Sequence, residues 1–140
     1  MKKFEFLDIT TADVCFVAYG KTLDELFENA GLALFEVMIN TKNIQPKIEK
    51  IIKVKGHDLL SLMFDWLNEL IYYSDKDNIA FSSFNVKIDE KEFELEAVCK
   101  GEEIDRDKHE VRTSVKSATY HRMEIKKEGD VWKAQVILDI

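Results

Sequence analysis

The chain has 140 residues, of which 46% are hydrophobic and 34% charged, and this composition is typical of one compact globular domain. Its formal net charge of -7 argues against a protein that binds nucleic acid by itself, because phosphate binding needs a clustered positive surface. No stretch reaches the ~18 apolar residues of a membrane span, and the N-terminus lacks the apolar run of a signal peptide. We therefore expect a single-domain, cytoplasmic protein that engages no membrane.

The first part of the chain predicts two strands, a helix and a third strand. Alternating apolar residues indicate strands over residues 3–7 and 13–19. Thr22 and the glutamate three residues later form a capping box, and apolar residues at helical spacing follow, so we expect a helix over residues 23–38. Residues 48–55 predict a strand that pairs at the edge of a sheet.

The middle of the chain predicts a second helix and a β-hairpin. Asp58 or Ser61 can cap the helix, and its apolar residues are so numerous that we expect core to surround it almost completely. Residues 84–88 and 93–99 alternate on either side of a turn at 89–91, which is typical of a hairpin.

The last part of the chain predicts a loop followed by two strands. The charged stretch 101–113 indicates a solvated loop, and residues 118–127 and 131–140 alternate as strands. His121 shares a predicted face with Met123, so we interpret it as a hydrogen-bonded histidine at the edge of the core. The order of elements predicts an α+β fold, a mainly antiparallel β-sheet with two α-helices packed on it.

Several segments of the chain resemble the archease family. Two lie near the N-terminus, at residues 6–14 and 18–30, and a third is Asp65-Trp66-Leu67-Asn68-Glu69-Leu70. The most specific segments close the chain, Val115-Lys116-Ser117-Ala118-Thr119-Tyr120-His121 and Trp132-Lys133-Ala134-Gln135-Val136-Ile137-Leu138-Asp139-Ile140. The likeness covers essentially the whole length, so residues 1–140 are identified as one archease-like domain.

The first of these segments departs from the family pattern, which usually reads Asp-His-Thr-Ala-Asp-Val-Gly. Here Asp8-Ile9-Thr10-Thr11-Ala12-Asp13-Val14-Cys15 carries one more residue, lacks the histidine and ends in cysteine. The aspartate that acts as a metal ligand in the family is kept as Asp13.

The resemblance implies an accessory protein and not an enzyme, with no catalytic residue of its own. Archeases look like factors that promote guanylylation of an RtcB-type ligase, which joins tRNA halves in tRNA splicing, and that permit its multiple turnover. The resemblance also implies a divalent-metal site whose ligands are Asp13, Asp139 and the carboxylate of Ile140. Lys116 would be a residue that faces the partner ligase.

The chemistry of these residues suits the implied site. Three anionic oxygen groups are adequate for a hard divalent cation such as Ca²⁺, Mg²⁺ or Mn²⁺. Asp13 begins one predicted strand and Asp139 ends another, so antiparallel neighbours would bring them together. By residue type alone, both carboxylates and Lys116 would be read as ordinary solvated groups.

Two other functions remain open. A stand-alone metal-dependent hydrolase or nucleotide-binding enzyme would use the same carboxylates with His121 as a base, and a chaperone-like protein for RNA-modifying enzymes would prevent aggregation without metal. The sequence contains no GxxxxGK[ST] loop, GxSxG elbow or HExxH helix, which favours the accessory role. Direct stable binding of nucleic acid is not expected.

Overall fold

The computed structural model describes residues 1–9 and 11–140. For Asp8 and Ile9 it describes only the backbone. The described chain forms strands, two α-helices and a short 3-10 helix in the order β1 (Phe4–Ile9), β2 (Asp13–Gly20), α1 (Leu23–Met38), η1 (Thr41–Asn43), β3 (Ile48–Lys55), α2 (Leu59–Asp77), β4 (Ile79–Asp89), β5 (Glu94–Glu103), β6 (Ser117–Glu128) and β7 (Val131–Asp139).

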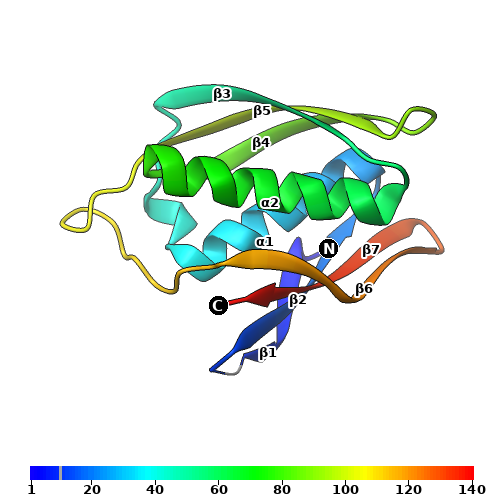
Figure 1. Cartoon of the computed structure of the whole chain (residues 1–140), viewed down its shortest axis with the longest axis horizontal. Helices are drawn as coiled ribbons and strands as arrows, with labels where there is room; N and C mark the ends of the chain where they lie inside the picture. The colour runs from blue at the N-terminus through cyan, green and yellow to red at the C-terminus, as the bar shows by residue number, and fades with distance from the viewer. Residues whose placement is uncertain (10) are drawn as a thin grey trace.

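The strands form two antiparallel sheets with both helices between them (Figure 1). The larger sheet has the order β1-β2-β7-β6, and the smaller one has the order β3-β5-β4. The predicted α+β architecture is confirmed, as is the edge position of β3. The sequence did not predict that the strands divide into two sheets, because hydrophobic alternation shows which side of a strand is buried and not which strands pair.

Both helices begin where their capping residues place them. Thr22 accepts a hydrogen bond from the backbone of Glu25 at 3.1 Å, and α1 runs over the residues predicted for it. Asp58 accepts from the backbone of Ser61 at 2.8 Å, while the Ser61 hydroxyl accepts from the Asp58 backbone at 3.1 Å, which completes a capping box for α2. The prediction that core surrounds α2 is wrong, because Tyr72 on this helix is 53% exposed.

The core has Trp66 of α2 near its centre. Its side chain is fully buried, and its indole N–H donates to the backbone oxygen of Phe27 in α1 at 2.9 Å. The ring also meets Phe84 of β4 edge to face, with centroids 6.0 Å apart. One side chain therefore connects both helices to the smaller sheet.

The hairpin β4–β5 is longer than predicted, because β4 begins earlier and β5 ends later than expected. β4 begins at Ile79 instead of residue 84, because its first residues are buried without alternation and a bulge lies between Phe81 and Ser83. β5 continues to Glu103, so the predicted loop does not begin at Gly101. A Cβ at Gly101 would stand 1.8 Å from the backbone oxygen of Ala80, which means that only glycine lets the two strands pair so closely here.

The charged segment after β5 is anchored and not merely solvated, contrary to the prediction. Glu102 and His109 are 5% and 4% exposed, and Nε2 of His109 lies 2.7 Å from Oε1 of Glu102. Nδ1 of His109 accepts from the backbone of Asp105 at 2.9 Å, so Nε2 carries the proton that is donated to Glu102. The carboxylate also accepts from the backbone of Gln45 and from Lys108, each at 3.1 Å.

This anchoring predicts a dependence of stability on pH. The backbone N–H of Gln45, together with His109 and Lys108, lowers the pKa of Glu102 from 4.5 to about 2. Because the pKa is depressed in the folded state, the stabilisation is complete above about pH 4.5 and is lost as the pH falls toward 2. Urea unfolding between pH 6 and pH 3 should therefore show a smaller loss of stability for Glu102→Gln than for the unchanged protein. Glu103→Gln, at an exposed neighbour, should keep the original pH dependence; the same slope in all three proteins would contradict the assignment.

The predicted environment of His121 is wrong. The pairing of β6 with β7 shifts between Thr119 and Glu124, and Arg122 has a φ of 53°, in the left-handed region. This irregularity reverses the alternation, so Met123 is buried while His121 is exposed. In the described part of the chain, no helix is long and apolar enough to cross a membrane.

Candidate metal centre

The beginning of β2 and the end of β7 lie side by side in the larger sheet. Asp13 stands directly opposite Asp139 in the register of these two strands. On the other side of β7, Asp139 is in register with Ser117, the first residue of β6. Asp13, Asp139 and Ser117 therefore form one row across three strands that come from opposite ends of the sequence.

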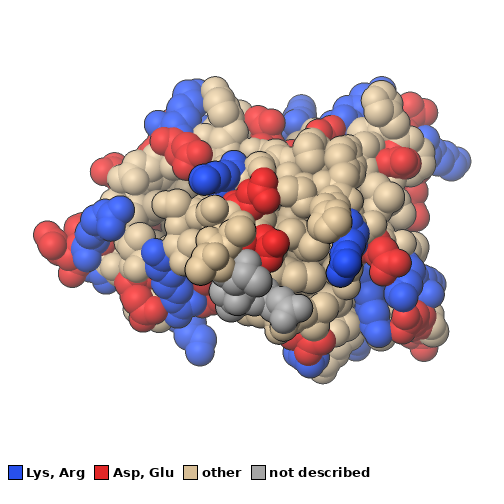
Figure 2. All heavy atoms as spheres, turned by 60° about the horizontal axis from the view of Figure 1, so that its bottom comes forward, with Lys and Arg blue, Asp and Glu red and all other residues tan. Residues whose placement is uncertain are grey.

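This row lies on the face of the sheet that points away from the helices. The adjacent row, Val14, Leu138 and Ala118, is buried at 2% exposure or less, and successive residues of a strand point to opposite faces. Asp13 is half-buried and Asp139 exposed. Figure 2 looks toward this side of the molecule and shows acidic side chains near the middle of the face, with mixed charges at both ends.

Two backbone hydrogen bonds bring the remaining predicted residues to the same place. The backbone N–H of Ile140 donates to the oxygen of Ala12 at 3.2 Å, which holds Ile140 beside the residue that precedes Asp13. The backbone N–H of Lys116 donates to the oxygen of Asp139 at 2.8 Å. All four residues named from the sequence therefore meet at one end of the larger sheet, and the side chain of Lys116 is exposed there.

The donor set fits a hard divalent cation. Directly opposed residues of antiparallel strands have Cβ atoms roughly 4.5–5.5 Å apart, so the carboxylates of Asp13 and Asp139 can reach one ion. The carboxylate of Ile140 would add a third anionic group, and water would complete the roughly six to eight oxygen ligands that Ca²⁺ takes. Among the described side chains, no group of three or more His, Cys, Asp or Glu residues could hold a metal ion.

The altered part of the first motif lies largely outside the described residues. This applies to Thr10 and to the side chains of Asp8 and Ile9. The backbone of Asp8 pairs with Cys15, which is half-buried and lies on the same face as Asp13, two residues further along β2.

Ser117 is a residue of this row that sequence reasoning did not single out. Its hydroxyl is a neutral oxygen donor placed next to Asp139, on the same outer face. The only signal in the sequence was its position after Lys116 in the closing motif. The pairing of β6 with β7, which places it in the row, could not be read from the residues.

Other residues considered from the sequence lie elsewhere or have structural roles. His121 is four positions beyond Ser117 on β6, about 13 Å along the strand at about 3.3 Å per residue, which separates it from the carboxylates. Asn68 holds β6 onto α2: the backbone of Ala118 donates to its side-chain oxygen at 2.9 Å, and its amide donates back at 3.3 Å. Asn68 therefore has a structural role in this fold.

The model of the archease protein family matches residues 4–140 of the chain. The chain belongs to the archease family. Among its relatives, protein archease of Methanothermobacter thermautotrophicus is 48% identical over 142 residues, and that of Sulfurisphaera tokodaii is 44% identical over 140 residues, each with 100% of both chains covered. These matches confirm the resemblance drawn from the sequence.

Solved structures of archeases share the fold as well. The solution structure of protein 1598 from Methanobacterium thermoautotrophicum matches with a TM-score of 0.87 and 48% identity, covering 100% of both chains. The crystal structure of an archease from Thermotoga maritima, described as a possible chaperone, matches with a TM-score of 0.66 and 25% identity, covering 94% of this chain and 93% of that one. An archease-type accessory role is what these comparisons support.

Proposed function

We propose that this archease activates an RtcB-type RNA ligase in the cytoplasm, promoting its guanylylation and its multiple turnover in tRNA splicing. The observation that supports this most is the meeting of Asp13, Asp139, Ile140 and Lys116 at one end of the larger sheet, in a chain that matches the family over nearly all its length. His121, the base that the alternative enzyme would use, is exposed and lies four residues beyond Ser117 on β6, apart from these carboxylates, which favours a helper over an independent enzyme.

The arrangement suits an ion that is shared with a partner. Asp13, Asp139 and Ile140 would hold a divalent cation, Ca²⁺, Mg²⁺ or Mn²⁺, which supplies positive charge for orienting nucleotide phosphates. Asp139 and Lys116 are exposed, so a docked ligase can reach the site directly. The ammonium of Lys116 offers a second positive group to a phosphate or to a carboxylate of the ligase.

The proposal is tested by ligation of tRNA halves with the ligase limiting. We expect the ligase alone to stop after about one turnover and a catalytic amount of this archease to restore repeated turnover. An unchanged number of turnovers per ligase molecule would contradict the accessory role.

Lengthening the chain beyond Ile140 should weaken cation binding, because a peptide bond then replaces the main-chain carboxylate of Ile140. We expect affinity for Mn²⁺ or Ca²⁺, measured by calorimetry, to fall at least about tenfold, the loss typical even of an outer ligand shell. An extension of equal length before Met1 is the matched control and should leave affinity unchanged. Equal affinity of the two lengthened proteins would show that Ile140 is not a ligand.

A chaperone-like role is a second candidate, supported by the description of the Thermotoga maritima relative as a possible chaperone. It predicts that this archease prevents the aggregation of a heated RNA-modifying enzyme equally well with and without a chelator. The ligase-activating role predicts instead that a chelator removes the effect on turnover. Comparing both assays with and without chelator separates the two functions.

A further inference from the structure

An exposed tyrosine lies beside α2, away from the carboxylate row. The ring of Tyr120 in β6 stacks flat on Phe64 of α2, with centroids 4.1 Å apart and an interplanar angle of 4°. Phe64 covers one side of the ring, and Tyr120 is nonetheless 52% exposed. The other side of this aromatic ring is therefore available to a partner.

The two elements that carry this pair of rings are held together by hydrogen bonds. Asn68, one helical turn after Phe64, exchanges two hydrogen bonds with the backbone of Ala118, at 2.9 and 3.3 Å. The same amide also donates to the oxygen of Phe64 at 3.0 Å. A ring held in this way loses little further freedom when a partner binds, which favours affinity.

The charges next to Tyr120 are negative. Asp65 follows Phe64 on α2, and Asp58 caps the same helix. Partial burial and the charges of Asp65 and Asp58 raise the pKa of Tyr120. The hydrogen bonds from Ser61 hold the pKa of Asp58 below its ordinary value, so this carboxylate is ionised at neutral pH.

Tyr120 differs from the other tyrosines of the chain in one respect. Tyr19, Tyr72 and Tyr73 each have a lysine ammonium between 4.2 and 6.0 Å from the ring centroid. Within residues 1–9 and 11–140, no lysine or arginine stands over Tyr120 in this way, although the negative charges of Asp65 and Asp58 act on it. The cation that an aromatic face and two carboxylates would attract is not supplied by the described chain.

We propose that the open face of Tyr120, with Asp58 and Asp65 beside it, is the docking position for an arginine side chain of the partner ligase, an inference that rests on the proposed function for the identity of the partner. A guanidinium can stack flat on the ring and donate two parallel hydrogen bonds to a carboxylate, whereas a lysine ammonium is a point charge that has no plane to stack. Tyrosine and arginine are also the residues that most often dominate binding at protein interfaces. A nucleobase could stack on the ring as well, but the two carboxylates would repel its phosphate.

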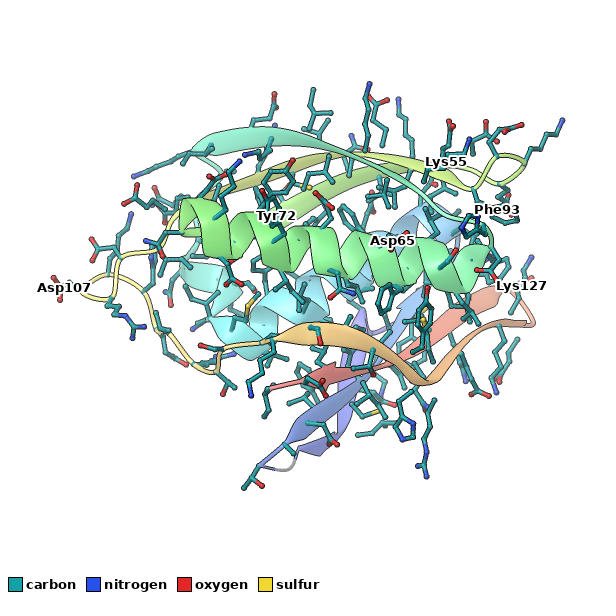
Figure 3. All side chains as sticks on the ribbon, viewed as in Figure 1. Lys55, Asp65, Tyr72, Phe93, Asp107 and Lys127 are labelled. Carbon is teal, nitrogen blue, oxygen red and sulfur yellow. The ribbon has the colours of Figure 1, made fainter. Side chains whose placement is uncertain are left out.

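The location suits joint use with the carboxylate row. Tyr120 is three positions beyond Ser117 on β6, on the order of 10 Å along the strand. A ligase anchored at Tyr120 can therefore also reach the end of the sheet where Asp139 and Lys116 lie. Figure 3 shows Asp65 in the N-terminal half of α2 and Tyr72 closer to its C-terminal end. Tyr72, an exposed tyrosine on the same helix, can therefore serve as a control for Tyr120.

The test compares variants in binding to the intact ligase. Tyr120→Ala should weaken binding about tenfold, within the range of a desolvated cation–π contact, and Asp65→Asn should weaken it less and reduce its salt dependence. Tyr120→Phe keeps the ring and should bind normally. Tyr72→Ala, at an equally exposed tyrosine that has its own lysine, should also bind normally. Equal affinity of Tyr120→Ala and the unchanged protein, with both folded by circular dichroism, overturns the docking position.

A second titration separates this inference from the proposed function. Tetra-arginine should shift the amide resonances of Phe64, Asp65 and Tyr120 in the unchanged protein, and tetra-lysine should do so more weakly. If the ligase does not bind at all, these shifts still support a guanidinium site while the proposed partner fails. Absence of the shifts, or the same shifts with a single-stranded oligouridylate, overturns the inference.

Discussion

Replacing Asp13 by asparagine should greatly lower the affinity of the protein for a divalent cation. Asparagine has almost the same size and can keep the strand pairing with Asp139, but it removes one of three anionic ligands. Because loss of an outer-shell partner alone costs about 10–100-fold in metal affinity, we expect a loss of at least about 100-fold. Calorimetry with Ca²⁺ or Mn²⁺, or terbium luminescence, measures it directly.

A matched control exists in the same sheet. Asp130 is an exposed aspartate in the turn between β6 and β7, far along both strands from the row. Asp130→Asn removes the same charge and should leave cation affinity unchanged. If the two variants bind the cation alike, Asp13 is not a ligand and the proposed site is wrong.

Replacing Trp66 by alanine should destabilise the protein by about 3–5 kcal/mol, the range for truncating a buried aromatic side chain. The change empties the space where α1, α2 and β4 meet, and it removes the hydrogen bond to the oxygen of Phe27. Urea unfolding followed by circular dichroism gives the change in the free energy of unfolding.

Two further variants serve as controls for the loss of stability expected for Trp66→Ala. Trp66→Phe keeps most of the volume but loses the indole N–H, so it should cost about 1–3 kcal/mol. Tyr72→Ala, at an exposed position of the same helix, should stay within about 0.5 kcal/mol of the unchanged protein. A loss for Trp66→Ala no larger than that for Tyr72→Ala would contradict the central place given to Trp66 in the core.

The helices were predictable because their signals are local. Thr22 and Asp58 each satisfy backbone N–H groups within the next turn, so the start of a helix depends on residues that are neighbours in sequence. The exposed side of α2 was not predictable, because Tyr72 differs from buried aromatic residues only in what the rest of the fold leaves uncovered. The extra length of β5 depended on Gly101, whose role appears only when β4 lies against it.

The candidate site was named from the resemblance, and strand pairing brought its residues together. Asp13 and Asp139 stand at opposite ends of the sequence, and no spacing rule connects them, whereas the register of β2 with β7 does. Ser117 and the exposed position of His121 both depend on β6, where an irregularity reverses the alternation in mid-strand. Such irregularities have no clear signature in a single sequence, so neither the place of Ser117 in the row nor the exposure of His121 could be predicted from the residues.

The most direct measurement is the initial rate of guanylylation of the RtcB-type ligase with a catalytic amount of this archease. It compares the unchanged protein with Asp13→Ala and with a chain lengthened beyond Ile140. We expect stimulation by the unchanged protein and by neither variant. Equal stimulation by all three would contradict the carboxylate site, and absence of stimulation by the unchanged protein would contradict the accessory role itself.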